Sequence, residues 1–451
     1  MAKRFTNARV AAAVAAALGL GLSATANAVV VVGGDNGWEV SFDGNINAFY
    51  VISDNDEGWN NLGYTAPSGN GSFAGTVVQE DVQRVQTGFL PAFFSFNVKS
   101  PTVNGLTATG RISFAPTINS STTKNQLYAG DPLSGNANNG IQGSSIDTRE
   151  VVVNIDAAWG TVSFGRTLSI FGRQAILNDM TLFGVGMANA DGAAVTAGRI
   201  GRGYTYPNFN ARFSYKTPVF AGLQAEVGLY DPSIETVANQ GNRVLNQTDS
   251  PRVEGEMTYT ATLGDATVKA WFDGLWQNIE TAGKNTFVSN AVDVHGWGSG
   301  ATAGFMGFNV TGYYYEGAGL GRSLQFAGGT ACDAPPAAGL AGTLTCEAAD
   351  NDGYYVQGTY SFFGKTKVGA SYGESNQDKF DTAGLTTVFK NQDVSLSMWT
   401  VGVYHDVNSW LKLIAEYSNG KNSFKANAAE ATTFTGETES QTVSLGTFFM
   451  W

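Results

Sequence analysis

Apolar and polar positions alternate along most of the chain after residue 28, in stretches of about ten residues separated by turns or polar loops. In the stretch 38–52, apolar or small side chains occupy the even positions, and polar side chains occupy the odd positions as far as Asn47. Stretches 106–114 and 442–451 repeat this alternation. Because successive side chains of a strand point to opposite faces, the pattern predicts β-strands with one apolar and one polar face.

The connections between these strands come in two lengths that alternate along the chain. Seven are short turns and eight are long polar loops, so that fifteen connections separate sixteen strands. Short turns on one side of a membrane and long loops on the other are typical of bacterial outer-membrane barrels. We therefore expect an all-β fold, a 16-stranded antiparallel transmembrane β-barrel. The short turns are predicted at 100–105, 158–160, 218–222, 263–265, 304–307, 363–364 and 405–409, and the long loops at 53–81, 117–145, 168–203, 231–250, 278–290, 317–352, 375–394 and 419–437.

Aromatic side chains gather near the predicted strand ends. Indole and phenol rings have one apolar and one polar end, which suits the interface between lipid and water. We expect most of them to form interfacial girdles, although packing in a soluble core would also use tryptophan. The group comprises Trp38, Tyr50, Trp159, Trp271, Trp276, Trp297, Trp399, Trp410 and Trp451.

The first 28 residues have the pattern of a secretory signal peptide. Three cations among the first nine residues precede an apolar stretch at 10–22, and an Ala-Asn-Ala sequence ends at Ala28. Small residues at these positions are what a signal peptidase requires, and the apolar stretch is short for a membrane anchor, the alternative. We expect a cleaved signal peptide at residues 1–28 and a single barrel domain at residues 29–451.

The charge balance excludes one class of partner. The chain has 26 Lys and Arg against 38 Asp and Glu, for a formal net charge of -12. Nucleic-acid-binding proteins present a basic surface, so we expect no nucleic-acid partner. Charged residues make up only 14% of the chain, against about 25% in soluble domains, which suits strands that face lipid on one side. A soluble secreted β-protein, the alternative, has no reason to segregate its loops by length.

Catalytic and metal-binding patterns are nearly absent. The only histidines are His295 and His405, which do not form a metal-spaced pair. A Gly-x-Ser-x-Gly sequence at 369–373 matches the nucleophile motif of lipases, but it lies inside an alternating strand and lacks the strand-turn-helix context of such a nucleophile. We expect no enzymatic activity, no metal and no cofactor.

Several short motifs occur in the order found in one known family. They are Asp-Thr-Arg at 147–149, Gly-Thr-Val-Ser-Phe-Gly-Arg at 160–166, Asn-Asp-Met at 178–180, and a strand-turn-strand pattern at 208–223. Together with the signal peptide and the final Trp451, they make the chain resemble the trimeric general porins of Gram-negative bacteria. That family usually ends in Phe, and the terminal strand resembles the signal that is read by the barrel-assembly machinery.

The resemblance implies a constriction inside the barrel. In general porins the third long loop folds into the pore, and its acidic residues face arginines of the wall. By this resemblance, loop 168–203 folds inward and Asp179 faces Arg149. The family's second acidic residue is missing and the nearest later carboxylate is Asp191, which leaves the ion preference open. Arg84 is a looser match to the wall arginines of the family, and Arg111, Arg202 and Arg212 are further candidates from strand parity. The candidate constriction residues are therefore Asp179, Arg149, Arg84, Arg111, Arg202 and Arg212.

The resemblance also implies a function. It describes a water-filled homotrimeric channel in the outer membrane, surrounded by lipid and lipopolysaccharide, through which small hydrophilic solutes and ions diffuse passively. Opposite charges across a narrow gap would orient water and disfavour apolar solutes. Two alternatives on the same barrel stay open: a channel selective for sugars, phosphate or small acids, and a structural or adhesive barrel whose loops bind a partner.

The two cysteines of the chain lie in one predicted long loop. Cys332 and Cys346 are separated by thirteen residues. Disulfides persist in exported proteins, so we expect a bridge, with free thiols as the alternative. Closing such a loop stabilises a protein by roughly 3 kcal/mol in the loop-entropy model, and the bridge would stiffen an exposed loop.

Overall fold

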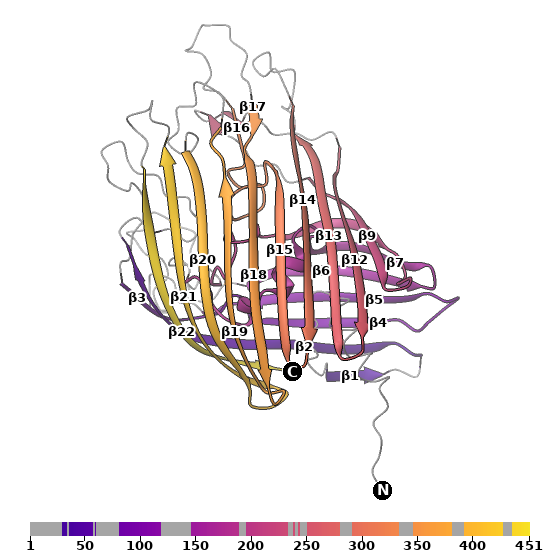
Figure 1. The fold of residues 1–451 in the computed structure, drawn as a ribbon. Helices are drawn as coiled ribbons and strands as arrows, with labels where there is room; N and C mark the ends of the chain where they lie inside the picture. Colours follow the sequence, from indigo (N-terminus) through magenta and orange to yellow (C-terminus); the bar gives the residue numbers. More distant parts are fainter. Residues whose placement is uncertain are drawn as a thin grey trace, which may run out of the picture.

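The computed structural model describes residues 29–33, 36–56, 59, 81–118, 146–188, 195–232, 238–239, 242–243, 250–279, 291–332, 346–380, 392–426 and 435–451. Within these residues the chain forms a closed antiparallel β-barrel with two short helices (Figure 1). The wall consists of β2 (Glu39–Asn55), β3 (Asp81–Gln86), β4 (Phe93–Lys99), β5 (Thr107–Pro116), β6 (Ile146–Ala157), β7 (Gly160–Leu168), β8 (Phe209–Lys216), β9 (Leu223–Tyr230), β12 (Arg252–Leu263), β13 (Ala266–Ile279), β14 (Val292–Phe305), β15 (Phe308–Ala318), β18 (Asp350–Phe362), β19 (Thr366–Gln377), β20 (Gln392–Asp406), β21 (Leu411–Ala426) and β22 (Gly436–Met450). The other elements are β1 (Val29–Gly33), α2 (Arg173–Asn178), η1 (Met180–Phe183), and the small pairs β10 (Ala238–Asn239) with β11 (Asn242–Arg243) and β16 (Thr330–Cys332) with β17 (Cys346–Ala348). None of the described helices is both long and apolar enough to span a membrane.

The 18 strands of the main sheet form sixteen rows that close on themselves. β3 and β4 lie in one interrupted row beside β2, and β1 extends the row of β22. The barrel closes where β22 pairs with β2, with Met450 opposite Asn45. Beyond this pair, Trp451 exchanges backbone hydrogen bonds with Gly44, and Val29 of β1 lies opposite Phe42. The predicted 16-stranded antiparallel barrel is confirmed.

The seven short turns lie where the sequence predicts them. Between β14 and β15, Met306 and Gly307 both have positive φ angles, of 48° and 89°. The connection between β18 and β19 has three residues, of which Phe363 and Gly364 also have positive φ angles, of 51° and 66°. The two-residue turn at Met306 and Gly307 has a twist that matches that of the flanking strands, so it joins β14 and β15 tightly. The predicted long loop at 168–203 is described except for residues 189–194.

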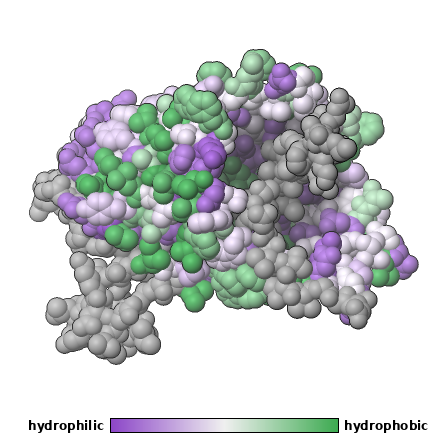
Figure 2. Space-filling view, turned by 90° about the horizontal axis from the view of Figure 1, so that it is seen from below, coloured by the Kyte–Doolittle hydropathy of each residue, from purple (hydrophilic) through white to green (hydrophobic). Residues whose placement is uncertain are grey.

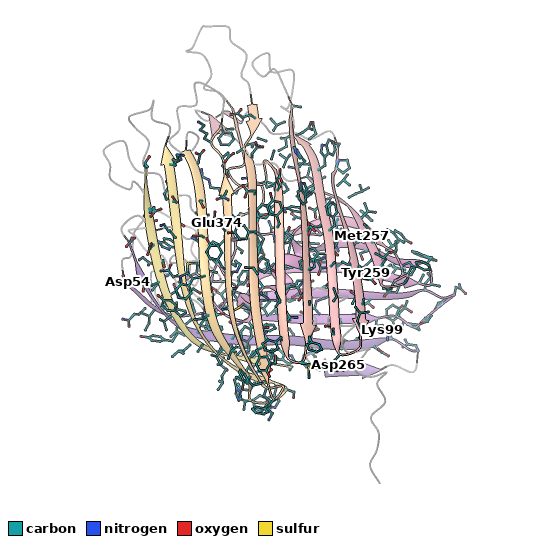
Figure 3. All side chains as sticks on the ribbon, in the orientation of Figure 1. Asp54, Lys99, Met257, Tyr259, Asp265 and Glu374 are labelled. Carbon is teal, nitrogen blue, oxygen red and sulfur yellow. The ribbon has the colours of Figure 1, made fainter. Side chains whose placement is uncertain are left out.

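The wall is apolar outside and largely polar inside, the reverse of a soluble sheet. On β12, Met257 and Tyr259 are exposed and point away from the barrel (Figure 3), whereas Glu254 and Glu256 are buried on the opposite face. Figure 2 shows apolar residues gathered on the outer surface of the molecule. An outward apolar band with polar residues facing the interior is the arrangement that a lipid environment stabilises.

Exposed or partly exposed aromatic rings form a row around the outside of β14 to β21. Each ring in this row either contacts the next ring or is its cross-strand partner. The order along the row is Trp297, Tyr314, Tyr354, Tyr372, Trp399 and Tyr417. Trp38, Trp159 and Trp410 are exposed near the short-turn end. Two levels of aromatic rings match the two interfaces of a membrane. Trp271 of the predicted group is instead buried and stacks on Tyr313, because strand alternation turns it inward.

Candidate pore constriction

The described residues of the connection from β7 to β8, 169–188 and 195–208, lie against the buried face of the wall, and we call them the constriction segment. It contains α2 and η1, and most of its described side chains are buried. Gly172, with a left-handed φ of 76°, starts α2. Asp179 ends α2 and caps η1, because its side chain accepts a hydrogen bond from the Thr181 N–H. These caps explain why the alternation of the wall gives way to two short helices here.

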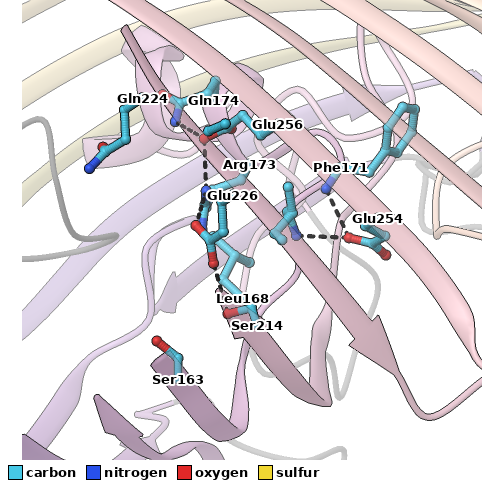
Figure 4. Close-up of polar contacts among 12 residues, drawn as sticks. Ser163, Leu168, Phe171, Arg173, Gln174, Ser214, Gln224, Glu226, Glu254 and Glu256 are labelled. Atoms are coloured by element: carbon cyan, nitrogen blue, oxygen red, sulfur yellow. Dashed lines mark hydrogen bonds and ion pairs between the residues drawn. The ribbon is translucent and has the colours of Figure 1, made fainter. Parts of the chain in front are cut away.

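Carboxylates of β12 and β13 hold the beginning of the constriction segment, and Figure 4 shows those of β12, Glu254 and Glu256. Glu254 Oε2 accepts hydrogen bonds from the N–H groups of Ile170 and Phe171, at 2.8 and 2.9 Å. Asp273 accepts one from the Gly172 N–H at 3.3 Å. N–H groups at a helix start have no partner within the helix, and hydrogen bonds to a carboxylate are stronger than those between neutral groups.

Arg173 extends this attachment to β9. Its Nη2 atom lies 2.9 Å from Glu226 and 2.8 Å from Glu256 (Figure 4). Burial lowers the pKa of Arg173, but the two carboxylates raise it well above its ordinary value, so the guanidinium stays charged. Arg212 Nη2 lies 3.1 Å from the same Glu226, which places this candidate residue in the attachment network.

Glu416 of β21 holds the segment beyond η1. Its Oε2 atom accepts hydrogen bonds from the N–H groups of Val185 and Gly186, at 2.6 and 3.0 Å. The Tyr404 hydroxyl donates to the other oxygen of this carboxylate. A Cβ atom added at Gly184 would lie 2.0 Å from Glu416 Oε1. Glycine at 184 is therefore required for the carboxylate to approach the backbone.

The row formed by β3 and β4 leaves the wall at residues 87–92 and meets the constriction segment. Asn47 of β2 fills the gap in the ladder, since its Nδ2 donates to the carbonyl oxygen of Leu90 at 3.0 Å. The Phe89 N–H donates to the carbonyl oxygen of Gly184 at 2.8 Å. The segment is thus attached to strands that lie far apart around the barrel.

Two buried arginines hold the second part of the segment against β20 and β21. Arg199 Nη1 donates to the Met398 carbonyl oxygen at 3.1 Å. Arg202 donates to the Ser397 carbonyl oxygen at 3.0 Å and to Asn422 Oδ1 at 2.7 Å. Burial and the neighbouring Arg199 lower the pKa of Arg202 to about 9. Arg202, a candidate from strand parity, therefore belongs to the segment and fastens it to the wall.

Asp179 lies inside the segment. Its carboxylate accepts hydrogen bonds from the hydroxyls of Tyr204 and Thr181, both at 2.7 Å. Arg199 Nε lies 3.7 Å away, and the side chains of Asp179 and Arg199 are both completely buried. The structure thus brings Asp179 to Arg199 of its own loop and not to Arg149. The spacing of these residues in the sequence gives no sign of this pairing.

Arg111 of β5 lies between two carboxylates of the wall. Its Nε atom is 2.7 Å from Glu150, and its Nη1 atom is 2.8 Å from Asp43. These ion pairs offset its charge locally. Arg84 of β3 lies opposite Val51 in register, and Val51 is completely buried. Because cross-strand partners share a face, Arg84 is on the inner side of the wall.

Arg149 is the extra residue of a β-bulge in β6. The register with β5 passes from Glu150 to Thr148 and leaves Arg149 without a cross-strand partner. A bulge changes the direction of a side chain, so Arg149 and Glu150 contribute to the same inner cavity although they are consecutive. Arg149 Nε donates to Asp147 at 3.0 Å, and its guanidinium lies 5.6 Å from the centre of the Phe209 ring.

A cavity of about 260 Å³ lies between the constriction segment and the wall from β4 to β6. The charged residues that line it, Arg111, Arg149 and Glu150, all come from the wall. The segment contributes mainly apolar side chains, among them Ile176, Leu177, Leu182 and Ile200. The cavity is therefore charged towards the wall and apolar towards the segment.

The sequence matches the family model of Gram-negative porins over residues 11–425. The chain belongs to the Gram-negative porin family. No curated protein matches this porin by sequence. Its fold is similar to that of the outer membrane channel DcaP of Acinetobacter baumannii, with a TM-score of 0.60 and 16% identity; the match covers 94% of this chain and 100% of that chain. Its fold is also similar to that of the anion-selective porin from Comamonas acidovorans, with a TM-score of 0.54 and 14% identity; the match covers 92% of this chain and 100% of that chain. A third similar fold is that of Salmonella typhi OmpF in complex with daunomycin, with a TM-score of 0.50 and 12% identity; the match covers 94% of this chain and 100% of that chain.

This porin is an outer-membrane channel for the passive diffusion of small hydrophilic solutes. The sequence-based assignments of family, outer-membrane location and channel function are thereby confirmed. The family and the fold are those of channels and not of enzymes.

The carboxylates that attach the porin's constriction segment were missed from the sequence. Glu254, Asp273 and Glu416 occupy polar positions of alternating strands, so strand parity could have placed them on the inner face. Their use as acceptors for backbone N–H groups of a distant loop has no sequence signature. The roles of Arg173 and Arg199 likewise depend on contacts between segments far apart in the chain.

Proposed function

We propose that residues 169–208 form the constriction of this channel, and that solutes pass between this segment and the wall from β4 to β6. The observation that carries the proposal is the attachment of one segment to Glu254, to Glu416 and to the excursion at 87–92. These attachments come from several sides of a barrel whose sixteen strands are wide enough for an aqueous channel. The cavity with Arg111 and Arg149 lies on the remaining side.

Conductance across a planar bilayer tests this proposal. In a KCl gradient, the double variant Arg111→Gln/Arg149→Gln should shift the zero-current potential towards cation preference, because two fixed cations leave the path. Lys99→Gln is the matched control, since Lys99 lies half-exposed near the short-turn end in a surface ion pair with Glu39. A zero-current potential that is the same in the double variant and in the wild type would show that the path lies elsewhere.

We propose that the porin assembles as a homotrimer, embedded in outer-membrane lipid and lipopolysaccharide. Outward-facing phenylalanines on β2 and β4 support an interface there: the Phe94 ring lies 5.6 Å from Phe42 and 4.9 Å from Phe96, centre to centre. Phenylalanine has no polar end, which suits a subunit interface better than a headgroup region. Light scattering of the detergent-solubilised protein should give the mass of three chains, and Phe96→Asp should reduce it.

We propose that residues 1–28 are removed on export. Support comes from β1 (Val29–Gly33), which follows the predicted cleavage site and takes a place in the wall, in the row that β22 occupies further along β2. Sequencing the N-terminus of protein purified from outer membranes should give Val29 as the first residue. Recovery of Lys3 and Arg4 in the mature protein would contradict the cleavage.

We infer that the porin has no hydrolase activity. The serine of the lipase-like motif, Ser371, lies within β19 opposite Gln357 and Thr400, and its hydroxyl accepts a hydrogen bond from Arg199. A nucleophile of that type sits on a sharp strand-to-helix turn with a histidine beside it. In the part of the chain that the structure describes, no group of three or more His, Cys, Asp or Glu residues could hold a metal ion.

We propose that Cys332 and Cys346 are bridged and brace the constriction. The two cysteines are register partners in the antiparallel β16–β17 pair, which supports a bridge between them. The chain just before β16 reaches the constriction segment, where the Tyr206 N–H donates to the Ser323 carbonyl oxygen at 2.7 Å. Peptide mass spectrometry without reduction should recover the two cysteines in one linked pair.

A further inference from the structure

The apolar side of the cavity is built by the constriction segment. Ile176, Leu182 and Ile200 line it and are each less than 10% exposed, whereas Leu177 lines it and is partly exposed. Apolar side chains that face a solute path hold water only weakly. A solute with an apolar body gains free energy by displacing this water, roughly in proportion to the apolar area that it covers.

The charged side of the cavity has one arginine that can accept a further partner. Arg111 is held by Asp43 and Glu150, and Glu150 also accepts a hydrogen bond from Thr167. Arg149 pairs with Asp147, whose side chain is 51% exposed, so solvent weakens this pair. Arg149 donates through Nε and Nη1, and its Nη2 atom makes no hydrogen bond to any described residue.

No described acidic side chain of the constriction segment lines the cavity opposite Arg149. Asp179 is completely buried among Tyr204, Thr181 and Arg199. The cavity is therefore not a gap between opposite charges, in which oriented water would exclude apolar solutes. At about 260 Å³ it is slightly smaller than the roughly 300–1,000 Å³ of sites for drug-sized ligands, so it suits a small solute.

We propose that this channel selects small amphipathic monocarboxylates, with the carboxylate on Arg149 and the apolar body against Ile176, Leu177 and Leu182. The inference rests on the proposed path through the cavity and adds the substrate class. Hydrogen bonds between arginine and carboxylates are charge-assisted, and the Nη2 atom of Arg149, which makes none to the described residues, supplies such a donor. Each methylene group buried against the segment strengthens binding about fourfold, from about 0.8 kcal/mol per methylene.

Block of the KCl current across a planar bilayer measures this binding. Acetate, butyrate and hexanoate are titrated against the wild-type channel, with bilayers lacking protein as the baseline. The half-blocking concentration should fall by about 16-fold from butyrate to hexanoate, two methylene groups apart. Hexanamide, which has the same length and no charge, should block more weakly than hexanoate.

Two variants assign the effect to the two sides of the cavity. Leu177→Asn should flatten the dependence on chain length, while Phe183→Asn should preserve it. Phe183 is the matched control because it is also a partly buried apolar residue of the segment but does not line the cavity. Arg149→Gln should remove the difference between hexanoate and hexanamide and keep the dependence on chain length.

The outcomes distinguish a failure of this inference from a failure of the proposed path on which it rests. Equal block by acetate, butyrate and hexanoate in a conducting wild-type channel would overturn the substrate class and leave the channel in place. A chain-length dependence that survives in Leu177→Asn would also overturn it, because the apolar body would then bind elsewhere. Absence of conductance in the wild type would overturn the proposed path and the inference with it.

Discussion

Glu416 offers a direct test of how the wall holds the constriction segment. The variant Glu416→Ala removes the acceptor of the Val185 and Gly186 N–H groups and of the Tyr404 hydroxyl. The carboxylate is buried, so water does not replace it without rearrangement. The attachments at Gly184 and on β12 remain in this variant, and the barrel should still fold.

The size of the effect follows from the two backbone donors. A buried N–H group without an acceptor costs about 1–3 kcal/mol, so two of them cost about 2–6 kcal/mol in the attached conformation. At the lower limit of about 2 kcal/mol, the detached conformation becomes about 30-fold more populated relative to the attached one. The change should be local to residues 182–188, because the anchors of α2 on β12 and β13 are unaffected.

Hydrogen–deuterium exchange and single-channel recording measure this change together. Amides of residues 182–188 should exchange at least about 30-fold faster in Glu416→Ala, and the open-channel current should become noisier. Glu437→Ala is the control, because Glu437 is exposed on β22 and pairs only with Lys421 among the described residues. Wild-type exchange rates at 182–188 together with wild-type current noise in Glu416→Ala would refute the attachment of the segment through this carboxylate.

Three further substitutions test other parts of the interior. Asp179→Asn should leave the ratio of potassium to chloride permeability unchanged, since the carboxylate is buried. In thermal unfolding it should cost about 3–5 kcal/mol of stability, because the buried Arg199 loses its partner. A changed permeability ratio would place Asp179 on the path. Arg111→Gln leaves Asp43 and Glu150 without their shared cation, and the zero-current potential in a KCl gradient should move towards cation preference; no movement would mean that Arg111 does not face the solute. Cys346→Ser should lower the stability by up to about 3 kcal/mol with a wild-type conductance, and an unchanged melting temperature would argue that a bridge contributes nothing.

The wall of the barrel could be predicted from the sequence because it depends on local rules. Alternation fixes which face of a strand meets lipid, and short turns such as Met306-Gly307 fix where one strand ends and the next begins. Trp271 shows the same rule at work, since its parity places it inside although its residue type suggested a girdle. The interruption at 87–92 was not predicted, because it is stabilised by Asn47 of another strand.

The site was less predictable because it depends on contacts between distant segments. The family motif predicted that Asp179 faces Arg149, but its partners, Tyr204 and Arg199, lie further along the same loop. Arg149 faces the cavity through a bulge, and a bulge shifts the alternation on which parity arguments depend. Arg202 was assigned by parity to the wall, whereas its segment has no strand alternation to which parity applies.

The net charge of -12 does not determine what this channel prefers, because the inner carboxylates have local partners. Glu254 and Glu416 are occupied by backbone N–H groups of the constriction segment, and Glu226 by Arg173 and Arg212. A carboxylate that is bound in this way contributes less to the field of a passing ion than one that faces water. The arginines beside the cavity would therefore act on a solute at short range, whereas the carboxylates named here hold the constriction segment.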